Sequence, residues 1–114
     1  QALAVATAIR EYDAVLPMLG LPESAVQRAC EVVGVRFVVE GFADRAYTPD
    51  GRLVPRTQTG ALITDPTDAA QQAQRLAKSG VESICVHSDT PGAVAVAAEA
   101  AMKDIADGKV KALP

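Results

Sequence analysis

The sequence VRFVVEGFADRAY, residues 35–47, decides the fold, because an apolar run rich in β-branched residues ends there in charged and aromatic side chains. Residues 35–39 are too short for an independent helix and predict a buried strand that leads into Glu40. A helix is expected just before this strand, since residues 22–33 carry apolar side chains at helical spacing and Gly34 follows as a stop signal. Helix followed by strand is the pattern that the rest of the chain repeats.

The same alternation continues in both directions. Further helices are expected over about residues 5–12, 65–79 and 90–105, the last one closed by Gly108, and further short strands at 14–19, 61–63 and 81–86. Turn chemistry at 48–52 opens a loop that runs through residue 59. Because parallel strands need long crossover connections, strands that alternate with helices predict an α/β fold with a parallel sheet. Four strands are few for a barrel, so the alternatives are a small open α/β domain or the C-terminal part of a (β/α) barrel, and a start within a helix favours the second.

Composition sets limits on the class of protein. The 114 residues are 49% hydrophobic with a net charge of -3, which predicts one packed α/β unit over 1–114 and a small-molecule or protein partner. Basic residues gather only at Lys103, Lys109 and Lys111, which indicates no nucleic-acid or anionic-membrane surface. No apolar run approaches the ~20 residues of a membrane span, and a cytoplasmic location is expected. Cys30 and Cys85 each lie in an apolar run and are expected to be inert core thiols.

Charged and aromatic side chains follow the strand at 35–39. In α/β folds, residues just past the carboxyl end of a strand face the ligand crevice. A carboxylate beside a guanidinium, as at Asp44 and Arg45, stays ionised and can bind an ammonium group, orient water or act as a base. The alternative is that these two residues only tie down the following loop. Arg56 in that loop is suited to grip a carboxylate or phosphate, although most loop arginines are merely solvated.

A second junction, CVHSDTPG at residues 85–92, repeats this arrangement. His87 is the chain's only histidine, and Asp89 follows two residues later, so the pair can do acid/base work or hold a metal. The helix expected after Thr90 adds a positive dipole suited to an anion. The alternative is a structural His87 with Asp89 or Thr90 as a helix cap. The sequence contains no phosphate-binding loop, dinucleotide-binding turn, zinc spacing or nucleophile elbow.

Four segments together resemble the LamB/YcsF lactam-utilisation family, which includes the A subunit of bacterial 5-oxoprolinase. They are EGFADRAY at 40–47, DGRLVPR at 50–56, GALI at 60–63 and ICVHSDTPGA at 84–93. The resemblance covers nearly the whole chain and implies a (β/α) barrel related to carbohydrate deacetylases. It implies an ATP-dependent opening of the lactam ring of 5-oxoproline to L-glutamate, carried out with the B and C subunits. ATP with Mg²⁺ would act in the complete complex, and no metal is predicted from this chain.

The resemblance also assigns roles to particular side chains. The expected catalytic residues are Glu40, Asp44, His87 and Asp89, and the expected substrate-binding residues are Arg45, Tyr47 and Arg56. The chain departs from the family at Ser88, where glycine is usual, and in a shorter connection between Gly80 and Ser83. Family members are about twice as long, so the 114-residue chain is expected to be inactive alone, as a fragment or as a split homologue completed by an N-terminal half. Two other functions stay open: a metal-dependent deacetylase-like hydrolase that uses His87 and Asp89, and a module that serves only for interaction with other subunits. The chain could also associate into a homo-oligomer instead of pairing with an N-terminal half.

Overall fold

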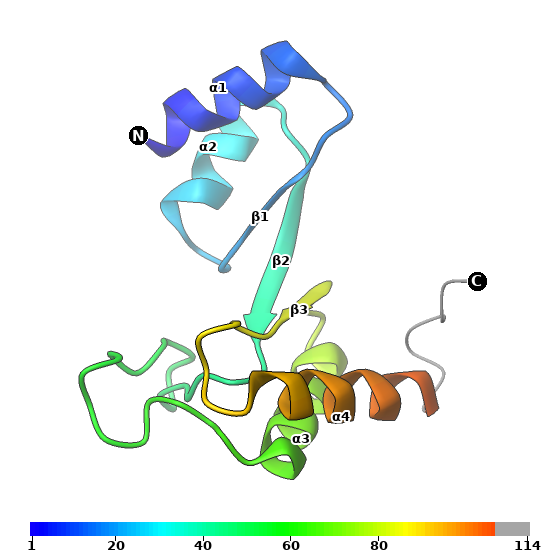
Figure 1. The fold of residues 1–114 in the computed structure, drawn as a ribbon. Helices are drawn as coiled ribbons and strands as arrows, with labels where there is room; N and C mark the ends of the chain where they lie inside the picture. Colours follow the sequence, from blue (N-terminus) through cyan, green and yellow to red (C-terminus); the bar gives the residue numbers. More distant parts are fainter. Residues whose placement is uncertain (107–114) are drawn as a thin grey trace. The chain divides into compact units, whose positions relative to one another are not determined.

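The computed structural model describes residues 1–106, in which helices and strands alternate (Figure 1). The elements are α1 (Ala2–Tyr12), β1 (Met18–Gly20), α2 (Ala25–Val33), β2 (Phe37–Phe42), α3 (Pro66–Lys78), β3 (Ser83–Cys85) and α4 (Ala93–Ala106). The predicted α/β class is confirmed. The expected close of the last helix at Gly108 lies outside the described residues. None of the described helices is long and apolar enough to cross a membrane.

The strands form one sheet in the order β1-β2-β3. β1 and β2 are paired in parallel. β3 runs in the same direction as β2, because the Glu82 N–H donates to the Val39 carbonyl at 2.9 Å and, further along both strands, the Ala43 N–H donates to the Cys85 carbonyl at 3.0 Å. The register of β1 on β2 is Met18 with Phe37, Leu19 with Val38 and Gly20 with Val39.

Two strand predictions are wrong in ways that matter for the site. Residues 61–63 do not form a strand: Leu62 makes an isolated antiparallel bridge with Arg45, because this short segment lies along the turn after β2 and not beside a strand. β2 begins two residues later than expected and continues to Phe42. Glu40 therefore lies inside the strand, and the turn that carries the charged residues begins after Phe42.

The chain divides into two compact units, and the first comprises Gln1–Gly41 with Gly80–Ser83. In it α1 packs on α2, with Ala6 and Cys30 fully buried. α2 ends at Gly34, whose φ of 81° is in the left-handed region that glycine adopts without strain. The Arg10 guanidinium donates to the Gly34 carbonyl at 2.6 Å, which ties α1 to the end of α2. Burial raises the pKa of the Cys30 thiol, with a smaller contribution from the charge of Glu31.

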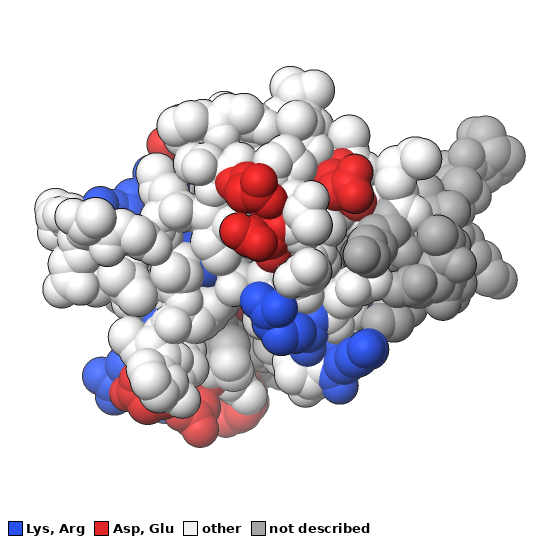
Figure 2. Space-filling model, turned by 90° about the horizontal axis from the view of Figure 1, so that it is seen from below, with Lys and Arg blue, Asp and Glu red and all other residues white. Residues whose placement is uncertain are grey.

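The second unit comprises Phe42–Ser79 and the described residues from Ile84 onward. α3 packs closely on α4, and the core between them is made of small side chains, with Ala43, Ala73 and Ala100 buried against Ile84 and Val86. On the face shown in Figure 2, basic and acidic side chains lie in small separate groups and not in one large patch of either sign. Because the second unit holds the turn after β2 and the loop after β3, it carries the candidate site.

Candidate active site

The turn after β2 is closed by hydrogen bonds from its own residues and from α3. The Phe42 N–H donates to the Tyr47 hydroxyl oxygen at 2.8 Å, so Tyr47, expected to bind substrate, helps to close the turn. The Gln72 side chain of α3 donates to the carbonyls of Phe42 and Arg45 at 2.8 and 2.6 Å. These hydrogen bonds hold the backbone of the turn in place, and Asp44 extends from it.

Asp44 is the centre of the site. Its side chain is fully buried, and its two carboxylate oxygens accept three hydrogen bonds: from the His87 N–H at 2.7 Å, from His87 Nδ1 at 2.9 Å and from the Thr90 hydroxyl at 2.6 Å. Burial by itself would raise the pKa of Asp44, but the bonds from Thr90 and His87 outweigh it and hold that pKa below its usual value. Asp44 is therefore a carboxylate at neutral pH.

His87 is oriented by this carboxylate. An ionised carboxylate only accepts hydrogen bonds, so Nδ1 carries the proton of the 2.9 Å contact and Nε2 is the nitrogen with a free electron pair in the neutral ring. The side chain is 24% exposed, and the Phe42 ring packs against it edge to face with centroids 4.7 Å apart. The prediction that the two junctions meet is confirmed for Asp44 and His87, and the pair has the geometry of a carboxylate–imidazole base.

Arg56 and Asp89 are brought together with each other. Arg56 Nη1 lies 2.9 Å from Asp89 Oδ2, and both side chains are exposed. The hydrogen bond and charge of Arg56 lower the pKa of Asp89. The pair ties the loop after β2 to the loop after β3. The Asp89 side chain makes no hydrogen bond to His87 among the described residues, so the expected His87–Asp89 pair does not form and Asp44 orients the imidazole instead.

Arg45 is a buried cation. It is only 8% exposed, and its Nη2 donates to the Val54 carbonyl at 3.0 Å. Its Nε is buried and has no hydrogen-bond partner. Among the described residues no carboxylate forms an ion pair with it. A buried guanidinium with a spare donor is suited to an anion, which is what the substrate-binding prediction for Arg45 requires.

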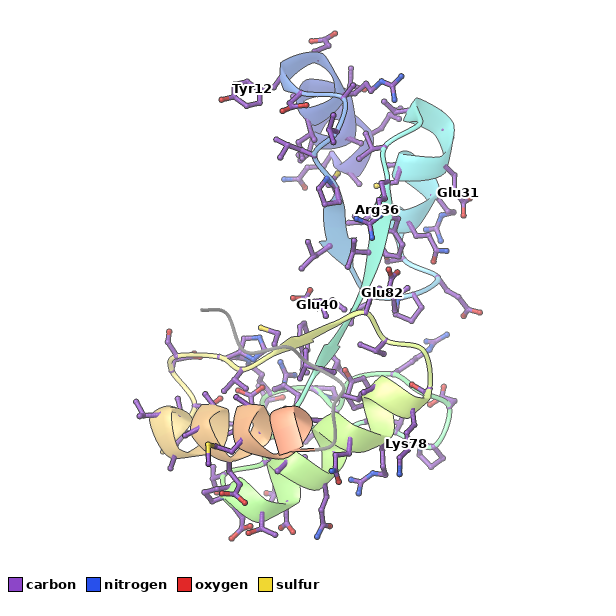
Figure 3. The ribbon with its side chains drawn as sticks, turned by 90° about the vertical axis from the view of Figure 1, so that its right-hand side faces the viewer. Tyr12, Glu31, Arg36, Glu40, Lys78 and Glu82 are labelled. Atoms are coloured by element: carbon purple, nitrogen blue, oxygen red, sulfur yellow. The ribbon has the colours of Figure 1, made fainter. Side chains whose placement is uncertain are left out.

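Glu40 makes none of the hydrogen bonds that join this cluster in the described residues. Figure 3 shows it on β2, whose residues up to Gly41 belong to the first unit. The hydrogen bonds that Asp44 accepts come from His87 and Thr90 and do not involve Glu40. The reason is the length of β2, which carries Glu40 within the strand and not past its end.

One residue of the site has a different role from the one predicted from the sequence, and another was missed. Thr90 was considered only as a helix cap, yet its hydroxyl bonds Asp44. Gln72 was missed, although it interrupts the alanine-rich face of α3 between Ala69 and Ala73 and is itself 9% exposed. A polar residue at a buried helical position is a signal of a specific hydrogen-bonding role.

An open hollow lies beside the cluster. It is lined by Ser88, Thr90, Gly92 and the first turns of α4 from Ala93 to Ala98. Thr90 lines the hollow and also donates to Asp44, so this residue lies between the hollow and the buried carboxylate. Among the described residues there is no group of three or more histidine, cysteine, aspartate or glutamate side chains placed to hold a metal ion.

The chain is similar in sequence to curated proteins. The chain is 46% identical over 111 residues to a Kocuria rhizophila protein that is named as the A subunit of 5-oxoprolinase, a match that covers 86% of this chain and 44% of that one. A protein of the same name from Streptomyces avermitilis is 44% identical over 110 residues, covering 85% of this chain and 44% of the relative. The chain thus spans about half the length of the curated relatives it matches.

A solved structure and a family model complete the comparison. The crystal structure of the lactam utilization protein from Thermus thermophilus superposes with a TM-score of 0.87 at 32% identity, covering 98% of this chain and 50% of that one. The model of the LamB/YcsF family matches residues 1–113. With its α/β order, its turn after β2 and its histidine loop in place, this chain belongs to the LamB/YcsF family.

Proposed function

We propose that this chain contributes to the A subunit of an ATP-dependent 5-oxoprolinase, which opens the lactam ring of 5-oxoproline to L-glutamate together with the B and C subunits in the cytoplasm. The observation that carries the proposal is the buried Asp44 carboxylate, which holds His87 Nδ1 at 2.9 Å. The relatives named for 5-oxoprolinase support the choice of reaction. Because the chain spans about half their length, the complete activity requires the longer assembly, and the 114 residues alone are inactive.

The Asp44–His87 pair can supply the base for hydrolysis of the lactam. His87 Nε2 takes a proton from water as the water oxygen bonds to the lactam carbon. Asp44 stabilises the imidazolium that forms, since its negative charge lies against Nδ1. The proton then passes to the ring nitrogen as the carbon–nitrogen bond breaks, which leaves a carboxyl group and a free amine.

ATP and Mg²⁺ are assigned to the complete complex. A lactam amide is unreactive, and a phosphoryl group transferred from ATP to its oxygen would make the lactam carbon open to attack by water. After the carbon–nitrogen bond breaks, that phosphoryl group would remain on the new carboxyl oxygen, and a second water would release it as phosphate. We assign MgATP to no residue of this chain and keep it as a requirement of the complete complex. The chain's part in the reaction is placed at the attacking water and at the ring nitrogen.

Arg45 is the proposed partner of the substrate carboxylate. Arg45 is more than nine-tenths buried as a residue and keeps an unpartnered Nε, so a bound carboxylate would satisfy both its charge and that donor. Arg56 bonds Asp89 through Nη1 at 2.9 Å, and the remaining donors of its exposed guanidinium could make a second anion contact. We also propose that the remaining length of the protein completes a (β/α) barrel of the deacetylase-like type around this site.

The test is an assay of the protein that carries this chain, combined with its partner subunits, in which glutamate formation and ATP consumption are measured together. Asp44→Asn and His87→Gln are each expected to lower kcat ~10² to 10⁴-fold, the range for loss of a general base. Asp68→Asn makes the same chemical change on an exposed position of α3 and is expected to leave kcat unchanged.

Two results would contradict the proposal. Wild-type kcat in both site variants would remove the Asp44–His87 assignment. A folded wild-type assembly that forms no glutamate from 5-oxoproline with ATP would favour a non-catalytic interaction role instead.

A further inference from the structure

We propose that Gln72 is a positioning residue, which holds the turn after β2 so that Asp44 orients His87 for catalysis. The inference rests on the proposed function for its catalytic consequence. Gln72 lies on α3, thirty residues along the chain from Phe42, and touches neither carboxylate nor imidazole in the contacts of the described residues. Its effect on the reaction must therefore be exerted through the backbone of the turn.

The contacts of Gln72 bracket Asp44. Its amide nitrogen lies 2.8 Å from the Phe42 carbonyl oxygen and 2.6 Å from that of Arg45, with that of Ala43 at 3.4 Å. The amide has two N–H groups, which the two short bonds use fully. Carbonyls on both sides of Asp44 are thus held by one side chain.

The rest of the turn is anchored from the opposite direction. The Ile63 N–H donates to the Asp44 carbonyl at 2.9 Å, and the Ala46 N–H donates to the Ala61 carbonyl at 2.9 Å. These bonds fix the backbone of the turn on both sides of Asp44, and with it the point from which the carboxylate extends toward His87. If Gln72 is lost, the carbonyls before and after Asp44 lose their shared donor and the turn can relax.

Glutamine suits this position for physical reasons. The site is buried, since Gln72 is 9% exposed, so carbonyls left there without a donor would have no access to water in its place. A glutamate would place an acceptor against three carbonyl oxygens. The small side chains of Ala69 and Ala73, both fully buried, bring α3 close enough for an uncharged amide to reach the turn.

The experiment compares Gln72→Met with Gln71→Met in the protein that carries this chain, combined with its partner subunits. Methionine keeps the length of the side chain and removes the donor, and Gln71 is its exposed neighbour on the same helix. Gln72→Met is expected to lower kcat ~10²-fold, the effect of a displacement of about 1 Å in a catalytic group, while KM changes little. Gln71→Met should behave as the wild type in both constants.

A spectroscopic measurement separates positioning from simple loss of stability. The ¹⁵N NMR signals of the His87 imidazole, assigned by their loss in His87→Gln, are expected to show a hydrogen-bonded Nδ1–H in wild type and in Gln71→Met. Gln72→Met should shift this signal toward the value of an imidazole that exchanges between tautomers. Wild-type kcat and an unchanged Nδ1–H signal in folded Gln72→Met would overturn the proposal.

A second variant covers the case in which Gln72→Met does not fold. Gln72→Lys restores a donor that can reach the same carbonyls and is expected to retain the Nδ1–H signal. A folded Gln72→Lys protein that lacks the signal would also contradict the inference. Because the NMR measurement needs no turnover, a wild-type protein that fails to hydrolyse 5-oxoproline would refute the proposed function while the effect of Gln72 on the Asp44–His87 pair is still decided.

Discussion

Asp44 shows how a single buried carboxylate can be both structural and chemical. Asp44 is fully buried, and each hydrogen bond to its carboxylate comes from His87 or Thr90 in the loop after β3. A buried charge without partners would cost several kcal/mol, so these donors are required for folding as well as for the orientation of His87. The stability of the chain should therefore depend on the ionisation of this one group.

The first prediction concerns acid. Because hydrogen bonds hold the pKa of folded Asp44 below that of the unfolded chain, its contribution to stability is present above about pH 4 and is lost as pH falls through the folded pKa. Asp44→Asn should unfold about 1–3 kcal/mol more easily at pH 7 and lose less of its stability between pH 5 and pH 2. Urea titrations across this range give the free energy of unfolding. Equal slopes in wild type and variant would contradict the expectation.

Among single residues, the meeting of Asp44 and His87 was predictable because both follow parallel strands at the same end of a sheet. The pairing of Arg56 with Asp89 was not, since 33 residues separate them and loop geometry decides the contact. Glu40 was expected just past the end of its strand, but it lies inside the strand because the strand is longer than its β-branched run. The strand does not stop at its β-branched run, and Gly41, which is buried, extends it to Phe42.

Capping residues explain why the start of α3 was predicted correctly and the start of α2 was not. The start of α3 was predicted at about residue 65, and the Asp65 side chain caps it by accepting the Asp68 N–H at 3.0 Å. The start of α2 was predicted at Pro22, but the helix begins at Ala25 after the cap Ser24. The intervening Glu23 has a φ of 59°, a left-handed conformation that prevents a helix from running through it.

The second prediction tests the cap of α3. Asp65→Ala removes the acceptor of the Asp68 N–H and should lower the free energy of unfolding by about 1 kcal/mol, the usual cost of losing an N-cap. Thr67→Ala, on the exposed side of the same first turn, is the matched control and should change it by less than about 0.5 kcal/mol. Urea unfolding followed by circular dichroism measures both. Equal effects would show that the cap bond contributes nothing.

Over the chain as a whole, the order of helices and strands was predictable because each element carries its own periodicity and stop signals. The missing strand at 61–63 was not, since a three-residue apolar run can bridge a turn as easily as it can join a sheet. The character of the core was also open to prediction. The chain is rich in alanine. Among the residues whose burial is described, alanines make up most of the buried apolar positions, and Val96 is the largest fully buried side chain.

The third prediction follows from that core. Alanine buries little apolar area, and burial contributes roughly 25 cal/mol per Å², so the 114-residue chain by itself should have a free energy of unfolding of about 5 kcal/mol or less. Urea unfolding at pH 7 checks the value. A cooperative transition corresponding to more than about 10 kcal/mol would show that contacts other than apolar burial dominate.

The close contact of α3 with the turn has a consequence for how such a sequence can change over time. Ala69, Ala70 and Ala73 are buried on the helix face that carries Gln72, so a bulkier substitution at any of them would push α3 outward and carry the Gln72 amide out of reach of its carbonyls. Substitution of these alanines is thus limited both by the packing of α3 and by the need to keep the Gln72 amide within hydrogen-bonding distance of the turn. Variation should accumulate on the opposite side of the helix, where Gln71 and Arg75 face solvent.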